Sequence, residues 1–230
     1  MAVGVGRRMD SGEEVSFCYC PEVFTNIIDL EHAKRVILTK EGALSSELRW
    51  DVETKFTIDT LLSLAAIDAQ SLVLDYGCGV GRLAKALIER VGCSVVGVDM
   101  SPRMRSLAID YVGSPRFSVY ASEQIVDMRF DYAVAAWVLQ HCLRPDMDVD
   151  LIARVLKPEA RFLVLEGFSR CVPVTVSGKL DEGVLWMRDD ANVRELILRH
   201  FELVQLGSFA PAELQALNDG TYWAVFRKAE

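Results

Sequence analysis

Short apolar runs alternate with amphipathic segments along most of the chain. The apolar runs predict strands near residues 71–76, 94–99, 116–120, 130–136 and 160–166. The segments between them predict helices near residues 81–91, 102–112 and 146–156. Continuous apolar runs are typical of parallel strands, because helices cover both faces of a parallel sheet. The alternation therefore predicts a doubly wound α/β fold with helices on both faces of the sheet.

The pattern changes after Asp189. A helix is predicted near residues 190–199, followed by a strand over FELVQLGSF, a short helix over PAELQAL and an alternating strand over TYWAVFRK. Two strands joined by such a short connection predict an antiparallel pair at the edge of the sheet.

The regions outside this core are the first 50 residues and the segment 167–188. Helical periodicity between Phe24 and Leu38 predicts an N-terminal helical extension (residues 1–50), and an amphipathic helix over residues 53–67 leads into the main domain (residues 51–230). Residues 167–188, with Cys171, Gly178 and Gly183, are predicted to form a long loop that lines a substrate pocket.

The most informative segment, residues 72–83, reads LVLDYGCGVGRL. A strand ends in Asp75, glycines follow at Gly77, Gly79 and Gly81, and a helix begins. Such glycines let the backbone turn sharply and approach a ligand, and the helix N-terminus favours an anionic group. Dinucleotide-binding domains use G-x-G-x-x-G, whereas the third glycine here comes one position early and Arg82 follows it.

Two carboxylates identify the ligand. Asp75 ends the first strand, where it would repel a pyrophosphate but suits an α-ammonium group. Asp99 ends the second strand 18 positions after Gly81, close to the roughly 20 expected for a group that accepts ribose hydroxyls. A ribose acceptor and an ammonium acceptor without a pyrophosphate cradle describe S-adenosylmethionine.

The motif D-x-G-x-G-x-G and the following VVGVDMS resemble those of class I S-adenosylmethionine-dependent methyltransferases. The segments RFDYAVAAWVLQH and LIARVLKPEARFLVLE are similar to the family's fourth strand and its fourth helix with the fifth strand, so the resemblance covers roughly residues 50–228. It implies a mostly parallel seven-stranded sheet with a reversed last strand, and the N-terminal helices would then be a lid over the substrate or packing against the sheet. The alternative is a Rossmann-like domain that binds another nucleotide or none.

The resemblance implies a set of cofactor-binding residues: Asp75, Gly77, Cys78, Gly79, Gly81, Asp99, Met100, Ala121, Ser122, Ala136 and Trp137. Asp75 would contact the methionyl ammonium or only cap the glycine turn. Met100 would cover an adenine face or belong to the core. Ala121 and Ser122 stand where the family presents a polar group to the adenine amine, and Ala136 and Trp137 where the reactive methyl lies.

His141 is the candidate general base, because its ordinary pKa suits proton removal near neutrality, and the alternative is a structural histidine. Arg49 and Trp50 would either reach the cofactor carboxylate or form a surface pair at a helix start. The six cysteines have no spacing that suits zinc, so no metal site is expected.

Composition narrows the acceptor class. The net charge of −8, without a basic run, argues against a nucleic-acid substrate. No apolar stretch is long enough to span a membrane and no secretory signal is recognisable, so a cytoplasmic location is predicted. We expect a methyltransferase that modifies O, N or C of a small molecule. The alternatives are a protein methyltransferase and a non-catalytic, S-adenosylmethionine-binding regulatory protein.

Overall fold

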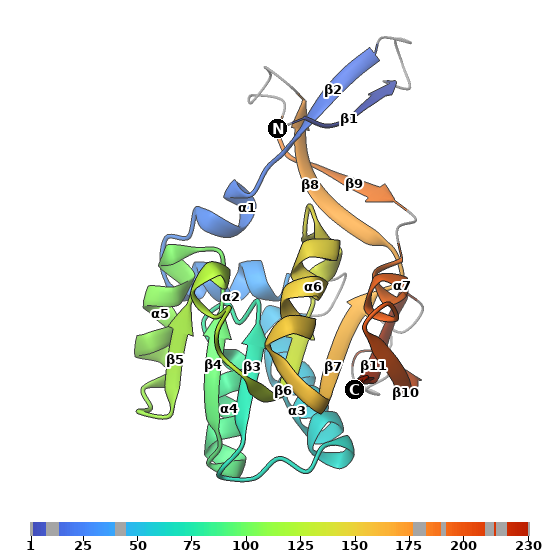
Figure 1. Cartoon of the computed structure of the whole chain (residues 1–230). Helices are drawn as coiled ribbons and strands as arrows, with labels where there is room; N and C mark the ends of the chain where they lie inside the picture. Colours follow the sequence, from blue (N-terminus) through green and yellow to red (C-terminus); the bar gives the residue numbers. More distant parts are fainter. Residues whose placement is uncertain are drawn as a thin grey trace.

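A seven-stranded sheet forms the centre of the computed structural model, which describes residues 2–7, 14–39, 45–176, 183–189, 192–209, 214 and 220–229 (Figure 1). The strands follow the order β10-β11-β7-β6-β3-β4-β5. Their bounds are β3 (Leu72–Tyr76), β4 (Ser94–Val98), β5 (Phe117–Tyr120), β6 (Phe130–Ala136), β7 (Leu156–Gly167), β10 (Phe201–Ser208) and β11 (Thr221–Lys228). Strands β3 to β7 pair in parallel, whereas β11 pairs antiparallel with both β7 and β10. The mostly parallel sheet and its reversed last strand are confirmed.

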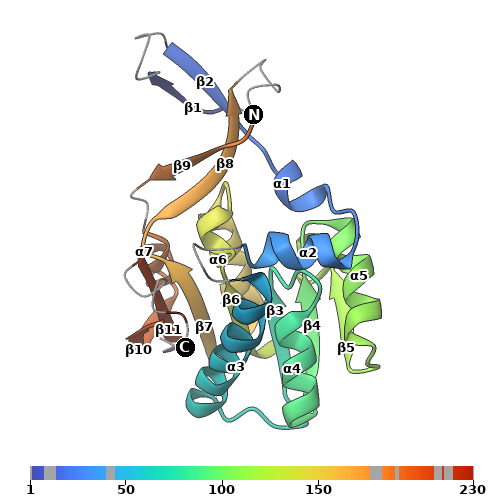
Figure 2. The same ribbon diagram turned by 180° about the vertical axis from the view of Figure 1, so that it is seen from behind.

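Helices cover both faces of this sheet. They are α3 (Ser46–Leu64), α4 (Arg82–Val91), α5 (Pro102–Val112), α6 (Pro145–Val155) and α7 (Val193–Ile197). Figure 2 shows α3 and α4 in front of the face opposite to the one that α6 and α7 cover in Figure 1. The pattern of the sequence marks α5 clearly, because the Ser101 side chain accepts a hydrogen bond from the Met104 N–H and Pro102 takes the first helical position.

Alternate residues of β3 contribute to two separate hydrophobic clusters. Leu74 and Tyr76 pack in the cluster that contains the α6 residue Ile152, whereas Val73 packs with Leu87 of α4. Because side chains alternate along a strand, Asp75 belongs to the α4 side and Tyr76 to the α6 side. This division decides which groups each of the two residues meets.

A second, four-stranded sheet lies beyond the carboxyl ends of the parallel strands (Figure 1). It consists of β1 (Ala2–Arg7), β2 (Glu14–Tyr19), β8 (Arg170–Val176) and β9 (Leu185–Asp189), in the order β1-β2-β8-β9 with antiparallel pairing. The expectation of a loop over residues 167–188 is therefore wrong for the described part, and the N-terminal extension is not helical throughout. Both corrections have one cause: β2 pairs with β8, far along the chain, and a local pattern does not reveal such a partner.

The helical part of the extension bridges the two sheets. It comprises α1 (Glu22–Thr25) and α2 (Leu30–Ile37), and α3 begins at Ser46, earlier than the predicted residue 53. Two 3-10 turns, η1 (Ser122–Gln124) and η2 (Leu139–His141), follow β5 and β6. Most of the predicted PAELQAL helix, and Gly178, lie outside the described residues. Within the described chain, no helix has the length and apolar character needed to cross a membrane.

Candidate cofactor and substrate site

A pocket of about 340 Å³ lies at the carboxyl ends of β3, β4 and β6. Eight predicted site residues line it: Gly77, Gly79, Asp99, Met100, Ser122, Ala136, Trp137 and His141. Parallel sheets bind ligands at this edge, where the strand order reverses between β3 and β6. A larger cavity of about 560 Å³ involves Ala66, Asp131 and Lys157, near the amino ends of the strands, and contains no predicted site residue.

The glycine loop comes so close to its neighbours that side chains would not fit. Gly77 has φ +73°, and a Cβ there would lie 2.3 Å from Cγ2 of Val138. Gly79 has φ +54°, and a Cβ there would lie 2.5 Å from Cδ1 of Ile37 in α2. The left-handed backbone and the lack of space both require glycine at these positions. The glycines thus let the side chains of Val138 and Ile37 pack directly against the loop.

Asp99 is held by the loop that it faces. Its Oδ2 accepts a hydrogen bond from the Gly79 N–H at 2.9 Å, and its Oδ1 accepts one from the Ser101 N–H at 2.8 Å. Burial raises the pKa of Asp99, while these two N–H groups and nearby Arg105 lower it. Each oxygen of the Asp99 carboxylate retains a lone pair. Two neighbouring hydroxyl groups of a ligand could therefore donate hydrogen bonds to the carboxylate at the same time.

Asp75 lies beneath the loop and is not part of the pocket lining. Its side chain is almost fully buried, and within the described chain its Oδ2 has no hydrogen-bond partner. Burial raises the pKa of Asp75 to about 7, against the opposing influence of Arg82 and of the Ala84 N–H. A buried carboxylate oxygen without a donor beside the glycine loop, and the Asp99 carboxylate in the pocket lining, together fit the ammonium and ribose groups of S-adenosylmethionine.

Three other predicted residues lie outside the pocket lining. Cys78 is buried toward β4, where a Cβ on Gly97 would lie 2.7 Å from its Sγ. Gly81 caps the start of α4 with φ +79°. Ala121 donates its N–H to Oε1 of Gln124 at 2.9 Å, whereas the adjacent Ser122 reaches the pocket.

His141 lines the pocket, but both of its ring nitrogens are engaged. Nδ1 lies 2.6 Å from the carbonyl oxygen of Cys171, which can only accept, so this nitrogen carries the proton. Nε2 then accepts from the Gln140 amide at 3.0 Å. Burial lowers the pKa of His141, and the rings of Phe24 and Trp186 lie 5.6 Å from its own. A role as general base stays a prediction, and this geometry favours the structural alternative.

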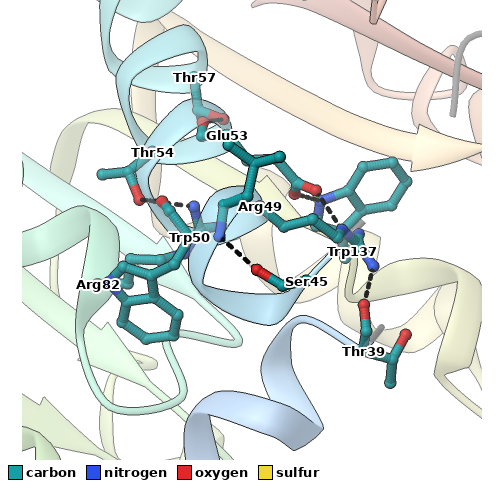
Figure 3. A network of polar contacts seen from close by, with 10 residues as sticks. Thr39, Ser45, Arg49, Trp50, Glu53, Thr54, Thr57, Arg82 and Trp137 are labelled. Atoms are coloured by element: carbon teal, nitrogen blue, oxygen red, sulfur yellow. Dashed lines mark hydrogen bonds and ion pairs between the residues drawn. The ribbon is translucent and has the colours of Figure 1, made fainter. Parts of the chain in front are cut away.

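A buried polar network behind the pocket was not expected (Figure 3). Glu53 of α3 accepts a hydrogen bond from Trp137 Nε1 at 2.8 Å and one from Arg49 Nε at 2.6 Å. Arg49 also donates to the Thr39 carbonyl. Arg49 is buried, so the interpretation of it as a surface residue was wrong. It is not part of the pocket lining, and its contact with the cofactor carboxylate stays a prediction. The signal in the sequence is the spacing of Arg49 and Glu53, four residues apart on one helix.

Glu166 is a second residue that the sequence analysis missed. It is fully buried at the end of β7, and it accepts hydrogen bonds from the backbone N–H groups of Val138, Leu139 and Gln140. Burial raises its pKa to about 8, and the three N–H groups oppose that shift. An acidic residue at the end of an apolar strand is the signal that identified Asp75 and Asp99, and the same signal is present at Glu166.

With this geometry established, three comparisons place the chain among known proteins. Residues 74–164 match the family model described as a methyltransferase domain. This match and the fold support the resemblance to class I S-adenosylmethionine-dependent methyltransferases. S-adenosylmethionine is the cofactor that this family implies, in agreement with the fit described above.

Two curated relatives and one solved structure illustrate the similarity. The methyltransferase GfsG of Streptomyces halstedii is 31% identical over 124 residues, which is 50% of this chain and 42% of that protein. The ubiquinone biosynthesis O-methyltransferase of Idiomarina loihiensis is 29% identical over 155 residues, which is 64% of this chain and 63% of that protein. A chain from the complex between the Trm112 methyltransferase activator of Haloferax volcanii and a methyltransferase superimposes with a TM-score of 0.61 at 18% identity, covering 80% of this chain and 93% of that one. This chain spans less than two thirds of either curated relative.

Proposed function

We propose that this chain transfers a methyl group from S-adenosylmethionine to O, N or C of a small molecule. The observation that carries the proposal is the convergence of Gly77, Gly79, Asp99 and Trp137 on one pocket at the carboxyl edge of the sheet. A pocket of about 340 Å³ is within the range of small-molecule sites, ~300–1,000 Å³. The relative named for ubiquinone biosynthesis supports a small acceptor as well.

The bound cofactor supplies an electrophilic methyl group on a positively charged sulfur. The chain's own residues bind and orient the two reactants and exclude water from the site. Asp99 would accept hydrogen bonds from the ribose hydroxyls, and Asp75 with the glycine loop would hold the methionine portion. Trp137 at the end of β6, and Tyr19 and Phe24 from the N-terminal extension, enclose the reacting groups. Holding two reactants in line can supply much of the rate enhancement without a dedicated acid or base.

Two alternative functions make different predictions. A protein methyltransferase would need room for a polypeptide, whereas α1, α2 and β2 contribute residues to this pocket and close it on one side. A regulatory protein without turnover would bind the cofactor and transfer nothing. The acidic net charge continues to favour an acceptor other than nucleic acid. An N-terminal segment that acts as a lid over the acceptor is part of this proposal.

Calorimetric titration with S-adenosylmethionine and, separately, with NAD tests the cofactor. We expect S-adenosylmethionine alone to bind, Asp99→Ala to abolish binding, and Asp110→Ala, an exposed acid on the following helix, to leave it unchanged. Binding of NAD, or no loss with Asp99→Ala, would contradict the proposal. Radiolabelled methyl transfer into a metabolite fraction then separates the functions, since label in protein, or none at all, would favour the two alternatives.

A further inference from the structure

Tyr76 and Asp148 form a polar pair inside the pocket. Tyr76 stands between Asp75 and Gly77, and strand alternation directs it away from Asp75 and toward α6. Its hydroxyl donates to Oδ1 of Asp148, in the first turn of α6, at 2.5 Å. Both residues line the pocket. The loop that holds the cofactor is thus joined directly to an acidic side chain on another element.

No cation within the described pocket lining pairs with Asp148. Arg144 is exposed, and its guanidinium bonds to both carboxylate oxygens of Asp146, at 3.0 and 2.7 Å. His141 is neutral for the reasons given above. Arg170 of β8 is close enough to lower the pKa of Cys142, yet it is not a lining residue. Among the residues that the structure describes, Asp148 is therefore stabilised by neutral groups and not by an ion pair.

The groups around Asp148 stay protonated. Burial and the Asp148 charge raise the pKa of the Tyr76 hydroxyl and of the Cys142 thiol. Burial likewise raises the pKa of Tyr19, which lies across the pocket, to about 12. Burial raises the pKa of Asp148 itself, and hydrogen bonding to Tyr76 and to Cys142 opposes that change. A ligand that approaches Asp148 thus meets a carboxylate with spare acceptor capacity beside neutral donors.

Apolar side chains also line the pocket beside Asp148. Phe24 of α1, Val138 after β6 and Leu143 before α6 contribute to the lining, and Tyr19 adds an aromatic ring. Such walls favour an apolar or aromatic body on the ligand. The part of the pocket around Asp148 therefore combines one charged hydrogen-bond acceptor with apolar walls.

We propose that Asp148, positioned by Tyr76, recognises the methyl acceptor and selects an uncharged or cationic molecule that presents an O–H or N–H group on an apolar or aromatic body. The inference rests on the proposed function and narrows its substrate class. A carboxylate or phosphate on the acceptor would face the Asp148 carboxylate, and like charges repel. Acceptors whose reactive end is anionic are therefore disfavoured.

The alternative role for Asp148 is purely local. An acid in the first turn of a helix stabilises the helix dipole, as Asp146 also does in α6. That role predicts a change in stability but no change in which ligands bind. Ligand discrimination is accordingly the deciding measurement.

The test uses the full chain saturated with S-adenosylhomocysteine, the demethylated form of the cofactor. Benzylamine, benzyl alcohol and benzoate share one aromatic body, and saturation-transfer NMR with calorimetry compares their binding. We expect the amine and the alcohol to bind roughly tenfold more tightly than benzoate, and Asp148→Asn to remove that preference. Tyr76→Phe should reduce this preference without changing the charge of the pocket. Asp150→Asn is the matched control, because Asp150 is an exposed acid on the same helix that pairs with His200.

Each outcome of the binding comparison supports or overturns the proposal. Tighter binding of the amine than of the alcohol identifies a cationic acceptor, and equal binding of the two identifies a neutral hydrogen-bond donor. Equal binding of all three probes, including no binding by any, overturns the proposal, as does a preference that Asp148→Asn leaves intact. Failure to bind S-adenosylmethionine in the titration that tests the cofactor would instead defeat the proposed function, so the two failures are distinguishable. Urea unfolding of each variant checks that it is folded.

Discussion

The indole nitrogen of Trp137 donates a hydrogen bond to the buried carboxylate of Glu53 across 2.8 Å, and this bond ties the wall of the pocket to helix α3. Trp137 has φ +61°, an uncommon conformation for a bulky residue, at the end of β6. Glu53 also binds Arg49, which donates to the Thr39 carbonyl just beyond α2. One carboxylate thus connects the pocket, α3 and the segment that follows α2.

Replacing Glu53 tests that connection. Glu53→Gln leaves the buried Arg49 guanidinium without its counter-charge, and breaking a buried pair in this way costs about 3–5 kcal/mol of unfolding free energy. Urea unfolding measures the loss. Asp51→Asn, an exposed acid on the same helix, should change stability by no more than about 0.5 kcal/mol. Similar losses in the two variants would show that the network contributes little to stability.

Gly77→Ala should damage both stability and cofactor binding. The new Cβ would lie 2.3 Å from Val138, and the φ of +73° adds backbone strain of about 1–2 kcal/mol. Gly113→Ala is the matched control, because Gly113 has φ +60° but no atom closer than 3.7 Å to an added Cβ. Both variants should lose stability through strain, whereas Gly77→Ala alone should weaken S-adenosylhomocysteine binding in calorimetry. Unchanged affinity in Gly77→Ala would remove this glycine from the site.

The raised pKa of Asp75 predicts that the stability of the protein depends on pH. Burial raises its pKa from 3.8 to about 7, so between these values the folded state holds a proton that the unfolded chain has lost. The contribution of Asp75 to the unfolding free energy therefore falls as the pH rises through this window, by at most about 1.4 kcal/mol per pH unit. Asparagine does not titrate, so Asp75→Asn should gain stability relative to the natural chain between pH 5 and pH 7. Urea unfolding at both values measures the difference, and parallel behaviour of the two proteins would refute the shifted pKa.

Much of the fold was predictable because its signals are local. The strand, the glycine turn and helix α4 follow one another within residues 72–91, and Ser101 with Pro102 marks the start of α5. Apolar runs that end in an acid located Asp75 and Asp99 at the carboxyl ends of neighbouring strands. The same signal at Glu166 was present but was not used.

Other features depend on partners that no local pattern reveals. Residues 170–176 form β8 because β2 lies beside them, and the pairing of Cys18 with Thr175 joins distant parts of the chain. His141 looked like a base by type and position. The carbonyl of Cys171, which fixes the proton on Nδ1, comes within reach only after folding, whereas Gln140 is the neighbouring residue in sequence.

The sequence by itself determined the order of the elements, the glycine loop and the two acids of the cofactor site, because periodicity and turn chemistry act over a few residues. The tertiary structure decided which side chains share the pocket and which charges remain unpaired there. Asp148 is an ordinary acid of a helix N-terminus in the sequence, and it becomes a pocket carboxylate only when α6 packs beside Tyr76. Burial and proximity between distant residues are properties of the packed chain, and they set the charge state and hydrogen bonding on which recognition depends.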